Sequence, residues 1–211
     1  MEFDFGLTEL GRIFHMDWWL SAETPEELVR RWADPLGENE YGLEELRLLR
    51  EDVQLLLASP LSDDEIHALW MAAANFYPES PVEGEAAPRG RAWLAEIDRE
   101  LQPHLQGFAY EPSGVATANE STLAVLVALA ERLTPRAEFP LEPSSARDVA
   151  AAVERCAREA SAALAFRFLL CAYVAYNSPV SSEAWSSFEE LNQSFGYGKF
   201  ILEMIEGYRE N

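Results

Sequence analysis

The side chains best suited to chemistry stand close together near the start of the chain. In the segment FHMDWW, His15 and Asp17 are placed among aromatic residues, with Phe14 before them and Trp18 after them. An imidazole two residues from a carboxylate could act as a general base with an orienting partner. The same pair could instead form a hydrogen-bonded structural anchor. Because a capped helix follows directly, we interpret the pair as a buried anchor.

The other residues used in metal sites and nucleophilic catalysis are scattered. His67 and His104 fall in separate segments, and Cys156 and Cys171 are fifteen residues apart in one apparent helix. That separation spans about 22 Å along a helix, too far for a disulfide, so both cysteines are interpreted as buried small hydrophobic residues. There is no CxxC, HExxH, GxSxG or phosphate-binding glycine motif. We therefore predict no catalytic residue, cofactor or metal, and leave open a helical enzyme with a cleft near the first histidine.

Apolar residues recur with a helical period through most of the chain, and no strand-like alternation extends beyond four residues. Capping residues and Pro or Gly breaks divide the pattern into segments. The first expected helices follow Thr24 and end at Asp34-Pro35, run from Leu43 to Ser59-Pro60, and follow Ser62 up to residues 77–78. The next span residues 91–101 and run from a cap within residues 117–120 to about Leu133. The last cover about 30 residues from Ser144 or Ser145 to Asn177 as one kinked helix or two, follow Ser181 or Ser182, and end the chain around residues 200–205. These segments predict an all-α fold, a helical bundle of about eight or nine helices.

A change of composition suggests how the chain is divided. Residues 78–90 are rich in proline, glycine and glutamate, which is typical of a loop or linker. We predict one helical part at residues 1–80, a linker at 81–90 and a second helical part of unassigned family at 91–211. The two parts could be packed against each other.

Charge restricts the class of partner. The chain has 37 acidic and 16 basic residues and a net charge of −21. Such a field disfavours nucleic acid and anionic membranes and attracts basic proteins, although acidity could also serve solubility alone. The most apolar stretch, residues 160–176, contains Arg167 and is shorter than the roughly 20 residues of a membrane span. With no basic segment ahead of an apolar run at the N-terminus, we expect a cytoplasmic protein.

Acidic residues of the first helices form the candidate binding surface. Several begin a helix, where the helix dipole already favours a negative charge. Asp34, Glu38 and Glu40, which we assign to the connection between the first two capped helices, have no such reason. Tyr41 beside them could supply contact area at low entropic cost. The predicted partner-binding residues are Asp34, Glu38, Glu40, Tyr41, Glu44, Glu45, Asp63 and Asp64.

Residues 7–78 also carry a resemblance. The segments GRIFHMDWWL, ETPEELVRRW, ASPLSDDEIHALW and NFYPE, in this order, resemble the immunity proteins of bacterial contact-dependent growth inhibition. The family's Phe-His-x-Asp-Trp motif falls on Phe14, His15, Asp17 and Trp18, which we interpret as structural.

The resemblance implies a cytosolic antidote that binds the C-terminal toxin domain delivered by a neighbouring cell. Many such toxins are nucleases with basic surfaces, which would suit an acidic inhibitor. The alternatives are an acidic all-α interaction or regulatory module with no toxin partner, and the helical enzyme.

Overall fold

The computed structural model describes residues 3–15, 17–75, 89–106, 118–136 and 145–210. Within these ranges 72% of the residues are helical and no strand forms, apart from an isolated bridge between Val180 and Arg209. The helices are α1 (Gly6–Ile13), η1 (Trp18–Leu20), α2 (Pro25–Leu36), α3 (Glu40–Ala58), α4 (Asp63–Ala73), α5 (Gly90–Leu101), α6 (Glu120–Glu131), α7 (Ala146–Glu159), α8 (Ala162–Ala175), α9 (Ser182–Ser194), η2 (Lys199–Leu202) and α10 (Glu203–Glu206). The all-α prediction is confirmed, and the ten α-helices in the described ranges are close to the expected number.

Short polar side chains set most of the helix starts. At the N-caps Thr24, Asn39, Ser62, Asn119, Ser145, Ser161 and Ser181, a side-chain oxygen accepts a hydrogen bond from a first-turn backbone N–H. Ser62 and Glu65 form a complete capping box. The carboxylate of Glu27 in α2 does not complete such a box with the cap Thr24. It accepts a hydrogen bond from the N–H of Glu23, one residue before that cap.

The corner between α2 and α3 differs from the sequence prediction. Helix α2 continues through Pro35 to Leu36, because a proline in the last turn removes one hydrogen bond without breaking the turns before it. Asn39 then caps α3, which starts at Glu40 rather than Leu43. The predicted loop of residues 37–42 is therefore only three residues long, 37–39.

The long helical segment expected from Ser145 to Asn177 is two helices. Helix α7 ends at Glu159, and the Ser161 side chain caps α8 by accepting from the N–H of Leu164 at 3.3 Å. Cys156 and Cys171 therefore lie in different helices rather than in one. Both are buried free thiols, as expected for small core residues.

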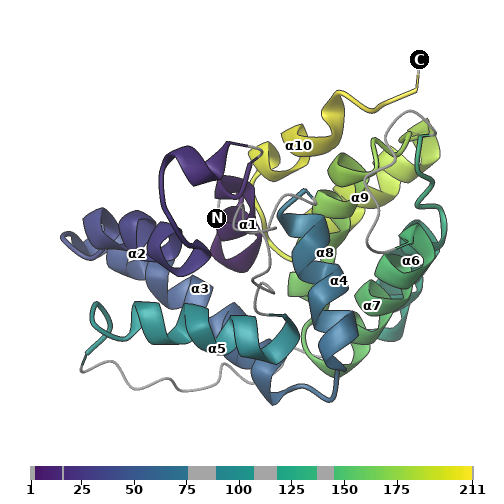
Figure 1. Cartoon of the computed structure of the whole chain (residues 1–211). Coiled ribbons are helices and arrows are strands. Elements are labelled where there is room, and N and C mark those ends of the chain that lie inside the picture. Colours follow the sequence, from purple (N-terminus) through teal and green to yellow (C-terminus); the bar gives the residue numbers. More distant parts are fainter. Residues whose placement is uncertain (1–2, 16, 76–88, 107–117, 137–144, 211) are drawn as a thin grey trace.

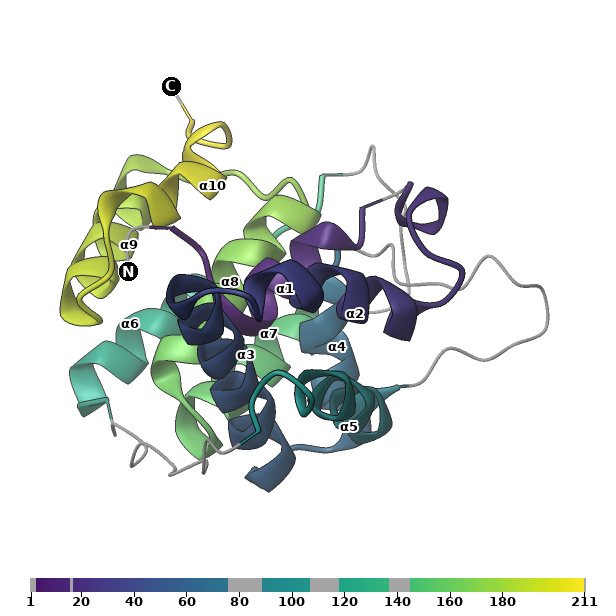
Figure 2. The same ribbon diagram turned by 90° about the vertical axis from the view of Figure 1, so that its left-hand side faces the viewer.

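Helices α4 and α8 lie between two groups of helices (Figure 1). On one side are α1, α2, α3 and α5, and on the other are α6, α7, α9 and α10. Helix α4 packs on α1 and α5 as well as on α7 and α8, and the view in Figure 2 shows α7 and α8 behind α3. One hydrophobic core includes residues from both groups. The two predicted parts are therefore closely packed, while most of the predicted linker lies outside the described residues.

A buried ion pair also joins the two groups. Arg167 on α8 donates to Asp52 on α3 at 2.6 Å, and the two side chains are 3% and 6% exposed. The other carboxylate oxygen of Asp52 accepts the N–H of Leu7. Arg167 also donates to the carbonyl of Phe5 at 2.6 Å and lies over its ring. This cluster fixes α1 against α3 and α8.

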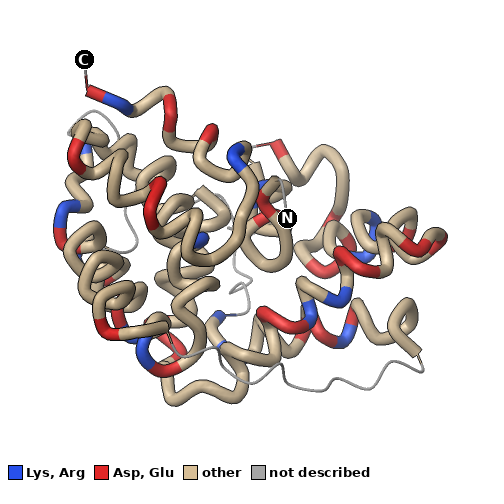
Figure 3. The backbone as a smooth tube through the Cα atoms, turned by 180° about the vertical axis from the view of Figure 1, so that it is seen from behind, with Lys and Arg blue, Asp and Glu red and all other residues tan. Residues whose placement is uncertain are grey.

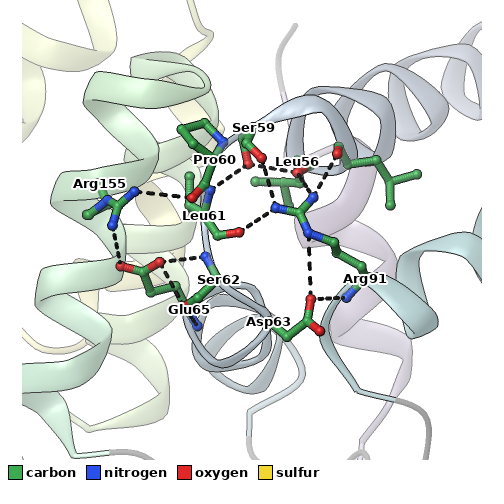
Figure 4. A network of polar contacts seen from close by, with 10 residues as sticks. Leu56, Ser59, Pro60, Leu61, Ser62, Asp63, Glu65, Arg91 and Arg155 are labelled. Atoms are coloured by element: carbon green, nitrogen blue, oxygen red, sulfur yellow. Dashed lines mark hydrogen bonds and ion pairs between the residues drawn. The ribbon is translucent and has the colours of Figure 1, made fainter.

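The turn between α3 and α4 is held by two arginines (Figure 4). Arg91 on α5 donates to backbone carbonyls at the end of α3 and in the turn, including those of Leu57 at 2.7 Å and Ser59 at 2.8 Å. From the opposite side, Arg155 on α7 donates to the carbonyl of Pro60 and pairs with Glu65 at 3.3 Å. These bonds satisfy carbonyls that the end of α3 leaves without intrahelical partners. The start of α4 is thereby fixed to α5 and α7.

Candidate partner-binding surface

The α2–α3 corner, residues 34–45, carries six of the eight predicted binding residues. Asn39 accepts the N–H of Gly42 at 2.9 Å and fixes the start of α3. A Cβ on Gly42 would come within 2.3 Å of the Leu36 carbonyl oxygen, so only glycine allows the two helices to approach this closely. The corner is thus a rigid projection, and Figure 3 shows acidic residues at its tip.

Several corner side chains have little or no internal partner. Glu38 and Glu40 are exposed and form no ion pair with any described residue, and Tyr41 is 72% exposed. Asp34 pairs with His104 at 3.3 Å, and Glu44 pairs with Arg47 at 3.0 Å. Two carboxylates and a phenol therefore face outward together, while the carboxylates beside them are already engaged.

The observed secondary structure removes the reason for which some of these residues were predicted to bind a partner. Asp34 and Glu40 lie in helices rather than in or next to a long loop. Glu40 occupies the first turn of α3, where the helix dipole stabilises its charge. Glu45 is half-buried. Its negative charge raises the pKa of Glu9 on α1, in addition to the larger rise that the burial of Glu9 causes. Glu38 is the one predicted acidic residue that does lie in a loop.

Asp63 and Asp64 do not join this surface. They begin α4, at the far end of α3, whose 19 residues span about 28 Å. Asp63 accepts the N–H of Arg91 at 3.3 Å, and Asp64 lies 3.7 Å from the guanidinium of Arg89. The structure therefore separates the predicted residues into two groups, and the second group contributes to the packing of α5.

The Phe-His-x-Asp-Trp motif is only half buried. Phe14 and Trp18 are in the core, where Phe14 contacts Trp70 and Trp93 with ring centroids 5.3 and 5.8 Å apart. His15 and Asp17 are exposed, so the prediction of a buried anchor is wrong. Their bond is local, since the Asp17 N–H donates to Nδ1 of His15 at 3.2 Å. Phe14 and Trp18 contact each other in the core with ring centroids 5.6 Å apart, whereas His15 and Asp17 are exposed to solvent.

A cavity of about 410 Å³ lies beside His15, between the ends of α1 and α4 and the faces of α8 and α10. Arg12 and Asn75 provide its other polar groups, and Asp17 is not in its wall. Burial raises the pKa of the adjacent Cys171 thiol, which stays protonated and weakly nucleophilic. Within the described residues, no group of His, Cys, Asp and Glu could hold a metal ion.

Comparison with protein-family models, curated proteins and solved structures finds no significant match. Among the described helices, none has the length and apolar character needed to cross a bilayer. An exposed pair of carboxylates with a neighbouring tyrosine, on a rigid corner, is suited to a cationic protein surface.

Two features outside the α2–α3 corner were not predicted from the sequence. The exposed hydrophobic residues Trp19 and Leu20 follow the motif and are 43% and 79% exposed. They lie next to the start of α2, at its opposite end from the corner. The other feature is Asp52 on α3, which is buried against Arg167. A single arginine in an otherwise apolar helix was the available signal that a buried carboxylate must lie nearby.

Proposed function

We propose that this protein is an immunity protein that acts in the cytoplasm, where it binds and neutralises a basic toxin domain of a contact-dependent growth inhibition system. The resemblance of residues 7–78 to that family supports this role. The exposed α2–α3 corner supports a protein-binding rather than a catalytic mode of action. Its ligand is the toxin domain itself, held in a stoichiometric complex.

One observation supports the α2–α3 corner as the binding surface. Glu38 and Glu40 are exposed without an ion-pair partner among the described residues, and Tyr41 is exposed beside them. Carboxylates at a rim accelerate encounter with a basic partner and set the orientation of the complex. A tyrosine can bury a large area at low cost in side-chain entropy, which makes it a suitable central contact.

A toxin that is a nuclease would fit this surface well. Its substrate-binding face must be basic to hold phosphates. An acidic protein bound there would occupy the face and exclude the nucleic acid. Inhibition would then follow from steric exclusion and charge, with no chemical step on the immunity protein.

The direct test is survival. The proposal predicts that the adjacent upstream reading frame encodes a large secreted protein with a variable C-terminal domain. That domain is expressed in a sensitive host, with and without this protein. We expect growth only when both are present. Continued killing at normal levels of intact protein would contradict the proposal, and recovery of the protein from its native cells in a complex without any toxin would favour an acidic regulatory module.

The surface is tested with matched variants. The triple variant Glu38→Gln, Glu40→Gln, Tyr41→Ala is compared with Glu131→Gln, Glu190→Gln, which removes two exposed charges from α6 and α9. We expect the corner variant to lose protection and to weaken the complex by about 10²-fold or more, since central aromatic contacts carry much of the affinity. Equal protection by both variants would place the toxin elsewhere on the protein.

A further inference from the structure

The N-terminal segment and the C-terminal part of the chain meet at an aromatic contact. Phe3 stacks on Phe200 of η2, with ring centroids 5.0 Å apart and an angle of 7° between the ring planes. Figure 2 shows the purple N-terminal segment reaching the yellow C-terminal part. Phe3 is 63% exposed, so the stack lies at the surface and is a weak attachment on its own.

Phe5, by contrast, is held firmly. Its carbonyl oxygen accepts a hydrogen bond from Arg167 at 2.6 Å, and the centre of its ring lies 4.0 Å from Cζ of the same guanidinium. Because Phe5 is fixed, residues 3–4 before it form a short strap, which we call the N-terminal strap. The strap is attached to the rest of the described chain through the ring of Phe3 and the carboxyl group of Asp4.

The carboxyl group of Asp4 is only partly hydrogen-bonded when the strap is docked. Its Oδ1 accepts from the hydroxyl of Thr8 at 2.7 Å, whereas its Oδ2 is buried and has no hydrogen-bond partner among the described residues. The terminal nitrogens of the nearby Arg167 donate to other groups, among them Asp52 at 2.6 Å. Docking of the strap therefore removes water from this carboxylate and returns a single hydrogen bond, which penalises the ionised form more than the neutral one.

The surroundings of Asp4 favour its protonated form. Burial raises the pKa of Asp4, and the charge of Arg167 and the hydrogen bond from Thr8 oppose only part of this rise. The other titratable or charged groups near Asp4 in the described chain are Glu9 and Arg12 on α1, Arg167 and Cys171 on α8, Asp52 on α3 through its ion pair with Arg167, and Tyr197 after α9. Burial also raises the pKa of Cys171 and of Tyr197, so both are neutral near neutral pH. Burial and the charge of Asp4 raise the pKa of Glu9, which is therefore the carboxyl group to compare with Asp4.

We propose that the N-terminal strap is an acid-tightened clasp: protonation of Asp4 favours docking of Phe3 on Phe200, and ionisation of Asp4 favours release. A carboxyl group whose pKa is higher in the docked state stabilises docking below its free pKa, and this contribution is lost as pH rises through the docked value. For each pH unit between the two pKa values, the ratio of docked to released strap falls by about tenfold. Release uncovers the ring of Phe200. The clasp involves neither the α2–α3 corner nor any toxin, so it is independent of the proposed function.

The test follows the contact between Phe3 and Phe200 by NMR in the full-length protein at constant ionic strength. Proton shifts of the Phe200 ring and cross-relaxation between the two rings report the docked fraction. The protein is titrated from about pH 8 to about pH 5. We expect the docked fraction to rise as pH falls. A docked fraction that stays constant over this range, or that decreases in acid, would overturn the proposal.

Matched variants assign the pH response to Asp4. Phe3→Ala, at an exposed position, defines the signal of the released strap. Asp4→Asn keeps the shape of the side chain without its charge, so it should hold the strap docked at every pH and raise the ratio of docked to released strap near pH 8 by about threefold or more. Glu9→Gln is the control, since it removes the neighbouring carboxylate of α1 and should preserve the pH response. A response that persists in Asp4→Asn, or that disappears in Glu9→Gln, would contradict the assignment.

A second measurement follows the proton itself. The ¹³C shift of the Asp4 carboxyl carbon reports its protonation directly. Because docking and protonation are linked, Phe3→Ala should lower the pKa of Asp4 towards its ordinary value, since the released carboxylate is solvated. Equal pKa values of Asp4 in Phe3→Ala and in the unmodified protein would show that docking and protonation are not coupled, without bearing on toxin protection by the α2–α3 corner.

Discussion

At the scale of single residues, Asp52 and Arg167 show that a charged side chain buried in an apolar environment needs an opposite charge beside it. Both side chains are buried, and the Leu7 N–H and the Phe5 carbonyl form hydrogen bonds with the pair, while Nε of Arg167 has no partner among the described residues. Burial opposes the charge of Arg167, yet the adjacent carboxylate raises its pKa overall, so the guanidinium stays ionised. Gly6 must lack a side chain here, because a Cβ would lie 2.1 Å from Oδ2 of Asp52.

Removing one member of this pair should be strongly destabilising. Asp52→Asn leaves the guanidinium buried without its counter-charge, and we expect a loss of about 3–5 kcal/mol in the free energy of unfolding. The double variant Asp52→Asn, Arg167→Met should lose less than the sum of the single variants. Urea unfolding followed by circular dichroism measures both. Glu183→Gln, which removes an exposed ion pair with Arg132, should change stability little, and an equally large loss there would contradict this reasoning.

Glu65 should link stability to pH. Partial burial raises its pKa, but hydrogen bonds from Ser62 and the charge of Arg155 lower it overall below the ordinary 4.5. A carboxyl whose pKa is lower in the folded state stabilises the fold above its unfolded pKa, and that contribution is lost as pH falls through the folded value. Glu65→Gln should therefore cost about 0.5–1 kcal/mol near neutral pH.

Urea unfolding measures the free energy of unfolding of Glu65→Gln and of the unmodified protein at a series of pH values from neutral to acid. The quantity compared is the difference between the two proteins at each pH. The difference should shrink once pH falls below the ordinary pKa of the carboxyl. A difference that stayed constant over the whole range would show that the charge of Glu65 contributes nothing. Glu190→Gln, at an exposed position, provides the baseline.

At the scale of elements, helix starts were more predictable than helix ends. Thr24 and Ser62 cap helices as expected, and the cap expected within residues 117–120 is Asn119, because an N-cap acts through a local hydrogen bond that the sequence displays. The end of α2 and the break at Ala160 were not located. Proline in a last turn costs little, and the break occurs where no proline or glycine marks it. Ends of this kind depend on what packs beside them.

The crossing of α1 and α4 depends on a glycine. A Cβ at Gly11 would lie 2.7–2.9 Å from the backbone and Cβ of Ala73. Gly11→Ala should therefore destabilise the protein by about 1–3 kcal/mol, because the two helices would have to move apart. Thermal unfolding measures the change. Gly207→Ala is the control, since nothing lies within 4 Å of the added group, and a similar loss there would contradict the packing argument.

At the scale of the whole molecule, the two groups of helices depend on each other. Helix α4 packs on α7 and α8, Arg155 on α7 pairs with Glu65 on α4, and Arg167 on α8 pairs with Asp52 on α3. A protein of residues 1–80 alone would expose the apolar face of α4 and leave Asp52 without its cation. We expect this fragment, and residues 91–211, to lack cooperative unfolding when expressed separately. Cooperative thermal transitions in both fragments would instead support two independently folding parts.

The overall charge leads to a prediction about rate. With a net charge of −21, association with a basic toxin domain should be steered by long-range attraction. The association rate measured by stopped flow should fall by about tenfold or more between low and high salt, while dissociation changes less. An association rate that is independent of salt would contradict the electrostatic part of the proposed function.

The sequence by itself determined the helical class of the fold and the N-caps at Thr24 and Ser62. Each of these follows from local hydrogen bonds or from a short apolar period that neighbouring residues define. Tertiary structure decided that His15 and Asp17 face outward, that Asp52 is buried, and that Asp63 and Asp64 lie at the end of α3 opposite the α2–α3 corner. Periodicity identifies an apolar face but gives no information on which polar residues another helix will cover, because that choice is made by contacts between residues far apart in the chain.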